Sequence, residues 1–197
     1  PFFILAGNIM AQGGLSGRLI RLANALVSPF SGGLAITTVA SSMFFAAISG
    51  SSPATVIAVG KVMLPAMMKE GYPRSFCIGL LMSAGSLGII IPPSIFMIVY
   101  GAVTGVSIGA LFLGGIGAGI LYGLVFIVVC AAYAKIRGIP RRANWDLVEL
   151  RGAFKDSLWG LAAPLIILGG IYGGIFTPTE AAGVAVLYAT LVTMLFY

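Results

Sequence analysis

The chain has 197 residues, of which 59% are hydrophobic and 8% are charged, and its mean hydropathy is +1.10. A soluble domain carries about 25% charged residues because its surface faces water, so a water-soluble monomer is excluded. Apolar runs of about 20 residues recur along the whole sequence, which excludes a single anchor or a cleaved signal peptide. The sequence therefore predicts an all-α polytopic membrane protein embedded in the lipid bilayer.

The residue types present also exclude several kinds of catalytic and metal-binding site. The chain has no histidine, which excludes Ser-His and Cys-His catalysis, histidine metal sites and histidine proton relays. Cys77 and Cys130 lie inside apolar runs, where we expect them to pack as small hydrophobes. The net charge of +6 is attributed to cytoplasmic loops and lipid headgroups. We therefore expect no organic cofactor, no transition metal and no nucleic-acid partner.

Residues 1–27 are predicted to form a re-entrant hairpin. The apolar stretch breaks at a Gly-Gly pair and resumes at Ser16, an expected N-cap, as an amphipathic helix. Each arm is shorter than the ~20 residues needed to cross a bilayer. We expect Asn8, Gly13, Gly14 and Ser16 to line a polar cavity, although Asn8 would serve equally well in an interhelical hydrogen bond.

Residues 34–69 are predicted to form a helix broken at membrane depth. Two apolar half-helices of about 16 residues, each about 24 Å long, flank the break, and together they exceed a hydrocarbon core of about 30 Å. The break offers hydroxyls, freed carbonyls and a helix N-terminus, which suit Na⁺ beside a carboxylate. The predicted sodium- and substrate-binding residues are Gly50, Ser51, Ser52, Pro53 and Thr55.

Residues 75–134 are predicted to form two membrane segments. The first is expected to break at the Pro-Pro pair, because proline disfavours helical geometry in the residue before it. The second is rich in small residues, which favour close helix packing; these are Gly114, Gly115, Gly117, Gly119 and Gly123. Further candidates to line the cavity surround the Pro-Pro break: Ser86, Gly88, Pro92, Pro93 and Ser94.

A polar, basic connector that consists of a loop and an amphipathic helix is predicted at residues 135–158, followed by further membrane segments in residues 161–197. Thr177, Pro178 and Glu180 form a capping-box pattern that predicts a helix from Pro178 onward. Because the chain starts without methionine inside an apolar stretch and stops inside another, we expect it to be part of a longer protein.

Repeated breaks at membrane depth, each with hydroxyls or an amide and none with a charge, are typical of secondary transporters. An enzymatic alternative is an intramembrane hydrolase that pairs Ser51 or Ser52 with Lys61. That pairing is disfavoured because Lys61 lies nine positions after Ser52, which is more than two helical turns; a lysine that snorkels to the interface explains Lys61 better. The sequence therefore predicts a transport protein and not an enzyme.

Four motifs stand out along the chain: PFFILAGNIMAQGGLS at residues 1–16, AISGSSPATV at 47–56, SLGIIIPPS at 86–94 and GGIFTPTEAA at 173–182. Taken together, they resemble one known family, the large permease subunit (M, DctM-like) of TRAP transporters. The resemblance covers essentially the whole chain.

This resemblance implies a sodium-coupled importer of organic acids, such as C4-dicarboxylates or sugar acids of the sialic acid type. The implied partners are a small membrane (Q) subunit and a periplasmic substrate-binding (P) protein, and the implied location is the inner (cytoplasmic) membrane of a bacterium or archaeon. An alternative from the same superfamily is a dicarboxylate or citrate carrier that needs no binding protein.

The resemblance also implies the elevator fold of the ion-transporter superfamily, with two inverted repeats that each hold a re-entrant hairpin and a broken helix. Residues 1–27 would be the first hairpin, and residues 50–55 would be the site in the first broken helix. The second hairpin and second broken helix would lie beyond Tyr197, so this chain would hold half of the transport site.

Overall fold

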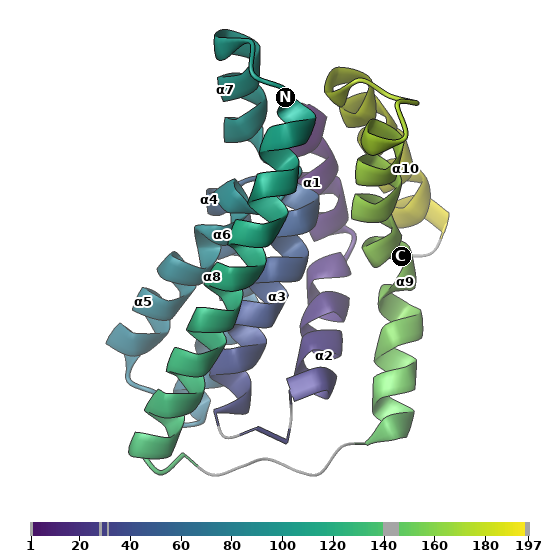
Figure 1. The fold of residues 1–197 in the computed structure, drawn as a ribbon. Helices are drawn as coiled ribbons and strands as arrows, with labels where there is room; N and C mark the ends of the chain where they lie inside the picture. The colour runs from purple at the N-terminus through teal and green to yellow at the C-terminus, as the bar shows by residue number, and fades with distance from the viewer. Residues whose placement is uncertain (1, 28, 31, 140–145, 196–197) are drawn as a thin grey trace.

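A computed structural model describes residues 2–27, 29–30, 32–139 and 146–195 (Figure 1). These residues are almost entirely helical, and the described part contains no strand. The helices are α1 (Phe2–Gln12), α2 (Leu15–Val27), α3 (Gly33–Ser49), α4 (Ser52–Lys69), α5 (Arg74–Gly85), α6 (Leu87–Ile90), α7 (Ile95–Thr104), α8 (Ile108–Ile136), α9 (Leu147–Tyr172) and α10 (Pro178–Leu195).

Several of these helices are long and apolar enough to cross a membrane. Within the described residues, α8, α9 and α10 qualify alone, and α5–α6 with α7 form one bent pair that qualifies together, as a broken span or a re-entrant loop. Large side chains such as Leu121, Val128 and Leu187 are exposed on the outside of the bundle, where lipid would cover them. The prediction of an all-α polytopic membrane protein is confirmed.

The predicted hairpin at residues 1–27 is wrong, because α1 and α2 follow one another along the length of α3. Asn24 near the end of α2 lies beside Thr37 at the start of α3, with 3.4 Å between Oδ1 and Oγ1. Gly7 in α1 instead packs against Ser49 at the far end of α3. Figure 1 shows α2 continuing in the direction of α1. The Gly-Gly break therefore interrupts this segment without reversing it.

The hairpin is formed by α3 and α4, which were predicted to be two halves of one spanning helix. Thr38 in the second turn of α3 lies 3.3 Å from the sulfur of Met67 in the last turn of α4, so the two helices are antiparallel and both outer ends lie on the same side. The reversal occurs at Gly50, whose φ of 60° is left-handed. Summed arm lengths cannot distinguish a straight span from a folded one, which explains the error.

The predicted break in residues 75–100 is confirmed. After α5 and the short α6, the chain is irregular from Ile91 to Ser94 before α7 begins at Ile95. The Pro92–Pro93 peptide bond is cis, and both prolines are buried. The helices on either side of this break are inclined by 40°.

The close-packing role predicted for the α8 glycines is confirmed for one face of the helix. Gly115, Gly119 and Gly123 are buried and recur every four residues, so they share a face. An added Cβ would meet Ile90 and Met97 at Gly115, Ile91 at Gly119, and Met43 at Gly123. Gly114 and Gly117 have no heavy atom near an added Cβ and lie outside this contact.

The predicted connector at residues 135–158 contains a helix, as expected, but this helix is continuous with the membrane segment that follows. Helix α8 continues to Ile136, and α9 begins at Leu147 and runs without interruption through the predicted boundary near residue 160. Residues 140–145 lie outside the described part. Arg21 of α2 forms ion pairs with Glu149 and Asp156 of α9, each at 2.7 Å, which fixes the polar end of α9 against α2.

Two smaller predictions are also confirmed. At the start of α10, the Glu180 carboxylate accepts hydrogen bonds from the backbone N–H and the hydroxyl of Thr177, at 2.8 and 2.7 Å. The Glu180 N–H donates to Thr177 Oγ1 at 3.3 Å, which completes the capping box. Cys77 and Cys130 are buried and unpaired, as expected of small packed hydrophobes.

Candidate ion and substrate site

The tip of the α3–α4 hairpin meets the break between α6 and α7. The Gly50 carbonyl accepts a hydrogen bond from the Ile95 N–H at 3.3 Å. A Cβ on Gly50 would overlap the carbonyl oxygen of Pro93, and a Cβ on Gly88 would lie 2.7 Å from the Ser51 carbonyl. Glycine at both positions therefore lets the two irregular backbone segments touch directly.

Buried hydroxyls reinforce this junction. The Thr55 hydroxyl is fully buried, donates to the Ser51 carbonyl at 2.9 Å and lies 3.1 Å from the Ser49 hydroxyl. The Ser94 hydroxyl, also fully buried, donates to the Ile89 carbonyl at 2.8 Å. The Ser94 bond satisfies a carbonyl at the end of α6 that has no intrahelical donor. The Thr55 bond adds to the one that the Thr55 N–H already makes to the Ser51 carbonyl at 3.0 Å, and together these bonds hold both breaks in one geometry.

Four helix ends converge at the junction. Helices α3 and α6 end there and contribute carbonyl groups, whereas α4 and α7 begin there, at Ser52 and Ile95, and contribute N–H groups. Helix C-termini favour a cation and N-termini favour an anion. Ser52 is half-buried, and within the described residues its hydroxyl has no hydrogen-bond partner. The junction can therefore place a small cation next to a carboxylate without using a buried charge.

The predicted site residues divide into two groups. Gly50, Ser51, Ser52 and Thr55 lie at the hairpin tip, and Gly88, Pro93 and Ser94 meet them from the broken helix. Pro53, in the first turn of α4, is exposed, and Pro92 is buried within the break. Ser86 is directed elsewhere, because its hydroxyl donates to Ser83 and to Tyr122 of α8.

The candidates around the first break do not reach this junction. Asn8, Gly14 and Ser16 line a separate cavity of about 630 Å³ that Lys61 and Gln12 also line. Gly13 faces α10, where its added Cβ would lie 2.5 Å from the Thr193 side chain. Asn8 is exposed to the cavity and makes no hydrogen bond to another described residue, which favours the cavity-lining interpretation of this residue.

A serine–lysine dyad is absent from the hairpin. Ser52 is the first residue of α4, and Lys61 is nine residues later, which places them about 13.5 Å apart along the helix axis. Lys61 lines the cavity beside α1, and neither Ser51 nor Ser52 lines that cavity. No proton transfer from either serine to Lys61 is possible at this separation.

Two residues of this region escaped the sequence analysis. Ser49 bonds Thr55 across the hairpin tip, and its place in the run of hydroxyls at residues 49–55 was the available signal. Gln12 lines the cavity beside α1, and its amide at membrane depth was the available signal. The role of each residue becomes clear once α4 is placed beside it, because Ser49 contacts Thr55 of α4 and Gln12 shares a cavity with Lys61 of α4.

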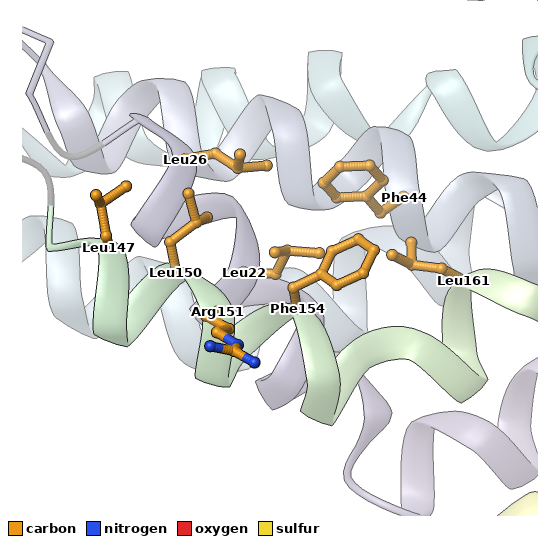
Figure 2. A pocket seen from close by; sticks show the side chains of 8 residues that line it. All are labelled: Leu22, Leu26, Phe44, Leu147, Leu150, Arg151, Phe154 and Leu161. Carbon is orange, nitrogen blue, oxygen red and sulfur yellow. The ribbon is translucent and has the colours of Figure 1, made fainter.

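A second hollow, of about 540 Å³, lies between α2, α3 and α9 (Figure 2). It is lined almost entirely by apolar side chains that face one another, including Leu22, Phe44 and Phe154, and Arg151 points away from them. This groove offers no polar group to orient a carboxylate, so it is distinct from the candidate site.

Comparison with known proteins places the chain in a family. Residues 1–197 match the model of "Tripartite ATP-independent periplasmic transporter, DctM component". The chain belongs to this family. Several of its relatives are named as large permease proteins of TRAP transporters, and the family is one of transporter components and not of enzymes. The family and the apolar helices together place it in the inner membrane.

Relatives carry several substrate names. The chain is 50% identical to the C4-dicarboxylate TRAP transporter large permease protein of Vibrio cholerae, over 100% of the chain and 44% of that protein. It is 48% identical to the ectoine TRAP permease of Halomonas elongata, over 97% of the chain and 45% of that protein. It is 46% identical to the isethionate TRAP permease of Oleidesulfovibrio alaskensis, over 98% of the chain and 30% of that protein. The chain thus spans less than half the length of these relatives.

Proposed function

We propose that the chain is part of the large permease subunit of a tripartite TRAP transporter that imports organic acids with sodium ions. Family membership supports the transport role. The observation that carries the site is the contact between the hairpin tip and the broken helix, where carbonyls, hydroxyls and two helix N-termini converge. A TRAP transporter works with a small membrane (Q) subunit and a periplasmic substrate-binding (P) protein, and we include both as partners.

The chemistry of the junction favours sodium over protons as the coupling ion. Within the described residues, the tip and the break contain no titratable side chain that could carry a proton between the two sides. Carbonyl and hydroxyl oxygens can replace the hydration shell of Na⁺. A bound Na⁺ would then favour a carboxylate at the N-termini of α4 and α7 beside it.

The substrate class follows from the same electrostatics. The substrates in the names of the relatives are C4-dicarboxylates, ectoine and isethionate, and each carries a carboxylate or a sulfonate. An anion of this kind matches the convergent N–H groups. We propose organic acids as the class, with C4-dicarboxylates as the first compounds to test.

The mechanism proposed is an elevator. The antiparallel α3–α4 hairpin and the broken α5–α7 segment would form the moving half-site, and a corresponding half-site elsewhere in the longer protein would complete it. In the longer protein, these two halves would enclose substrate and sodium together.

Reconstitution tests this function. The full-length permease with its small subunit is placed in proteoliposomes, and uptake of radiolabelled succinate, isethionate or ectoine is measured with and without an inward sodium gradient and the binding protein. We expect uptake to require both the inward sodium gradient and the binding protein. Uptake that persists without the binding protein would instead indicate a carrier independent of it, and uptake driven equally by a proton gradient would contradict sodium coupling.

A further inference from the structure

We propose that the cavity between the α1–α2 break and α4 binds the anionic group of the transported acid, with Lys61 as its countercharge. This inference rests on the proposed function and deepens it, because it places a second anion contact away from the hairpin tip. The cavity has a volume of about 630 Å³, which accommodates a small organic acid. Its polar lining consists of Asn8, Gln12, Gly14, Ser16, Gly17 and Lys61.

The charge of Lys61 has no partner within the described part of the chain. No carboxylate lies within ion-pair distance of its ammonium group there. The chain has five acidic residues, and none of them lines this cavity: Glu70 follows the end of α4, Asp146, Glu149 and Asp156 lie at the start of α9, and Glu180 caps α10. Lys61 is exposed where it lines the cavity, and a lysine within a membrane helix that has no countercharge favours an external anion.

The rest of the polar lining also supplies hydrogen-bond donors. Asn8 and Gln12 are exposed on α1, one turn apart, and each has an amide NH₂. Gly14, Ser16 and Gly17 surround the start of α2. The first N–H groups of a helix have no intrahelical acceptor, and the helix dipole makes this end positive. Ammonium, amides and a helix N-terminus thus line the same cavity, which is the donor set of an oxyanion site.

The cavity also follows α4 toward the hairpin tip. Ala54, Ile57, Ala58 and Lys61 recur at helical spacing and share one face of α4. Ala54 lies in the first turn of α4, two residues after Ser52, and is about 10.5 Å along the axis from Lys61. An acid that binds Lys61 would therefore lie on the face of α4 that leads to the junction.

Substitution of Lys61 in the full-length permease tests this site. In the proteoliposome assay, Lys61→Gln should raise the concentration of acid needed for half-maximal uptake about ten-fold or more, because a charge-assisted contact is lost. Lys61→Arg keeps the charge and should stay close to wild type. Lys69→Gln removes a lysine from the last turn of the same helix, outside the cavity, and serves as the matched control. The sodium concentration for half-maximal uptake should not change in any of them.

A labelling experiment measures occupancy without transport. Ile57→Cys places a thiol in the cavity one turn from Lys61, where the side chain is exposed, whereas Cys77 and Cys130 are buried. Succinate should slow the reaction of this thiol with a charged methanethiosulfonate reagent. The protection should disappear in the Ile57→Cys, Lys61→Gln double variant. Lys69→Cys, outside the cavity, should show no protection.

The outcomes separate the two proposals. Lack of sodium-driven uptake by the wild type would overturn the proposed function. Normal wild-type uptake, with an unchanged half-saturation in Lys61→Gln and no protection of Ile57→Cys by succinate, would overturn the anion site alone. Protection by vesicles of anionic phosphatidylglycerol but not by succinate would assign the cavity to a lipid headgroup and would equally overturn the proposal.

Discussion

The Gly50 carbonyl accepts a hydrogen bond from the Ile95 N–H across two helix breaks that are 45 residues apart in the sequence. This bond joins the tip of the α3–α4 hairpin to the first residue of α7. Because it links the two segments in which backbone is irregular, it makes them a single unit. A disturbance of either segment is therefore expected to affect the other.

Gly50→Ala tests the contact between the tip and the broken helix. Gly50 has a positive φ, and its Cβ would overlap the Pro93 carbonyl, whereas Gly71 has a positive φ of 84° and open space around it. Both alanine variants should lose about 1 kcal/mol or more to left-handed strain. Gly50→Ala should lose a further 1–3 kcal/mol, roughly, from overpacking. Thermal unfolding of the purified permease measures this, and equal melting temperatures for the two variants would contradict the contact.

Two glycines of α8 should respond in opposite directions to the same substitution. An added methyl at Gly119 would overlap Ile91, so Gly119→Ala should destabilise the protein by about 1–3 kcal/mol. Gly117 is exposed, with nothing near an added Cβ, so Gly117→Ala should be neutral or stabilise by up to about 1 kcal/mol. The comparison is made by thermal unfolding in detergent. The packing of α8 against the Pro92–Pro93 break would be wrong if both variants behaved alike.

Glu180 is expected to act as a helix cap and to have no part in proton transfer. Its carboxylate accepts two hydrogen bonds from Thr177, so Glu180→Ala should lower the melting temperature by a few degrees. The dependence of uptake on external pH should remain that of the wild type, and Glu180→Gln should keep most of the stability. A shifted pH profile in Glu180→Gln would instead indicate that the carboxylate titrates during transport.

The sequence was sufficient to locate the breaks but not to show how the chain turns at them. Gly50 and Pro92 predicted irregular backbone correctly, since glycine and proline disfavour a continuous helix by local sterics, and Pro53 marked the first turn of the next helix. Whether two arms fold back or continue depends on what they pack against. The Thr38–Met67 contact and the Gly7–Ser49 contact, between residues far apart in the sequence, decided that the hairpin is α3–α4 and that α1–α2 is extended.

For the candidate site, too, the sequence located the individual motifs but not the contact between them. Hydroxyls and glycines of residues 50–55 and of residues 88–94 were recognised separately because each motif is local. Their meeting at the Gly50–Pro93 contact could not be derived, because nothing in either motif specifies its partner. Lys61 was explained as a snorkelling side chain for the same reason: its meaning changes only when Asn8 and Gln12 of α1 are placed opposite it.

Thr55 is expected to position the junction. Its hydroxyl donates to the Ser51 carbonyl and is fully buried, so Thr55→Ala should both lower stability by about 1 kcal/mol and raise the sodium requirement for uptake. Thr55→Ser keeps the hydroxyl and should retain the sodium dependence of the wild type. Uptake at graded sodium concentrations measures the effect, and a Thr55→Ser variant as impaired as Thr55→Ala would indicate that the methyl group matters instead.

Sodium titration of Ser52→Ala measures the central claim most directly. The Ser52 hydroxyl stands at the hairpin tip without a partner in the described part of the chain, so its loss should remove one oxygen available to Na⁺ and leave the fold intact. We expect the sodium concentration for half-maximal uptake to rise about five-fold or more, with wild-type thermal stability and unchanged acid half-saturation at saturating sodium. A sodium dependence identical to that of the wild type in Ser52→Ala and Thr55→Ala would contradict sodium binding at the junction.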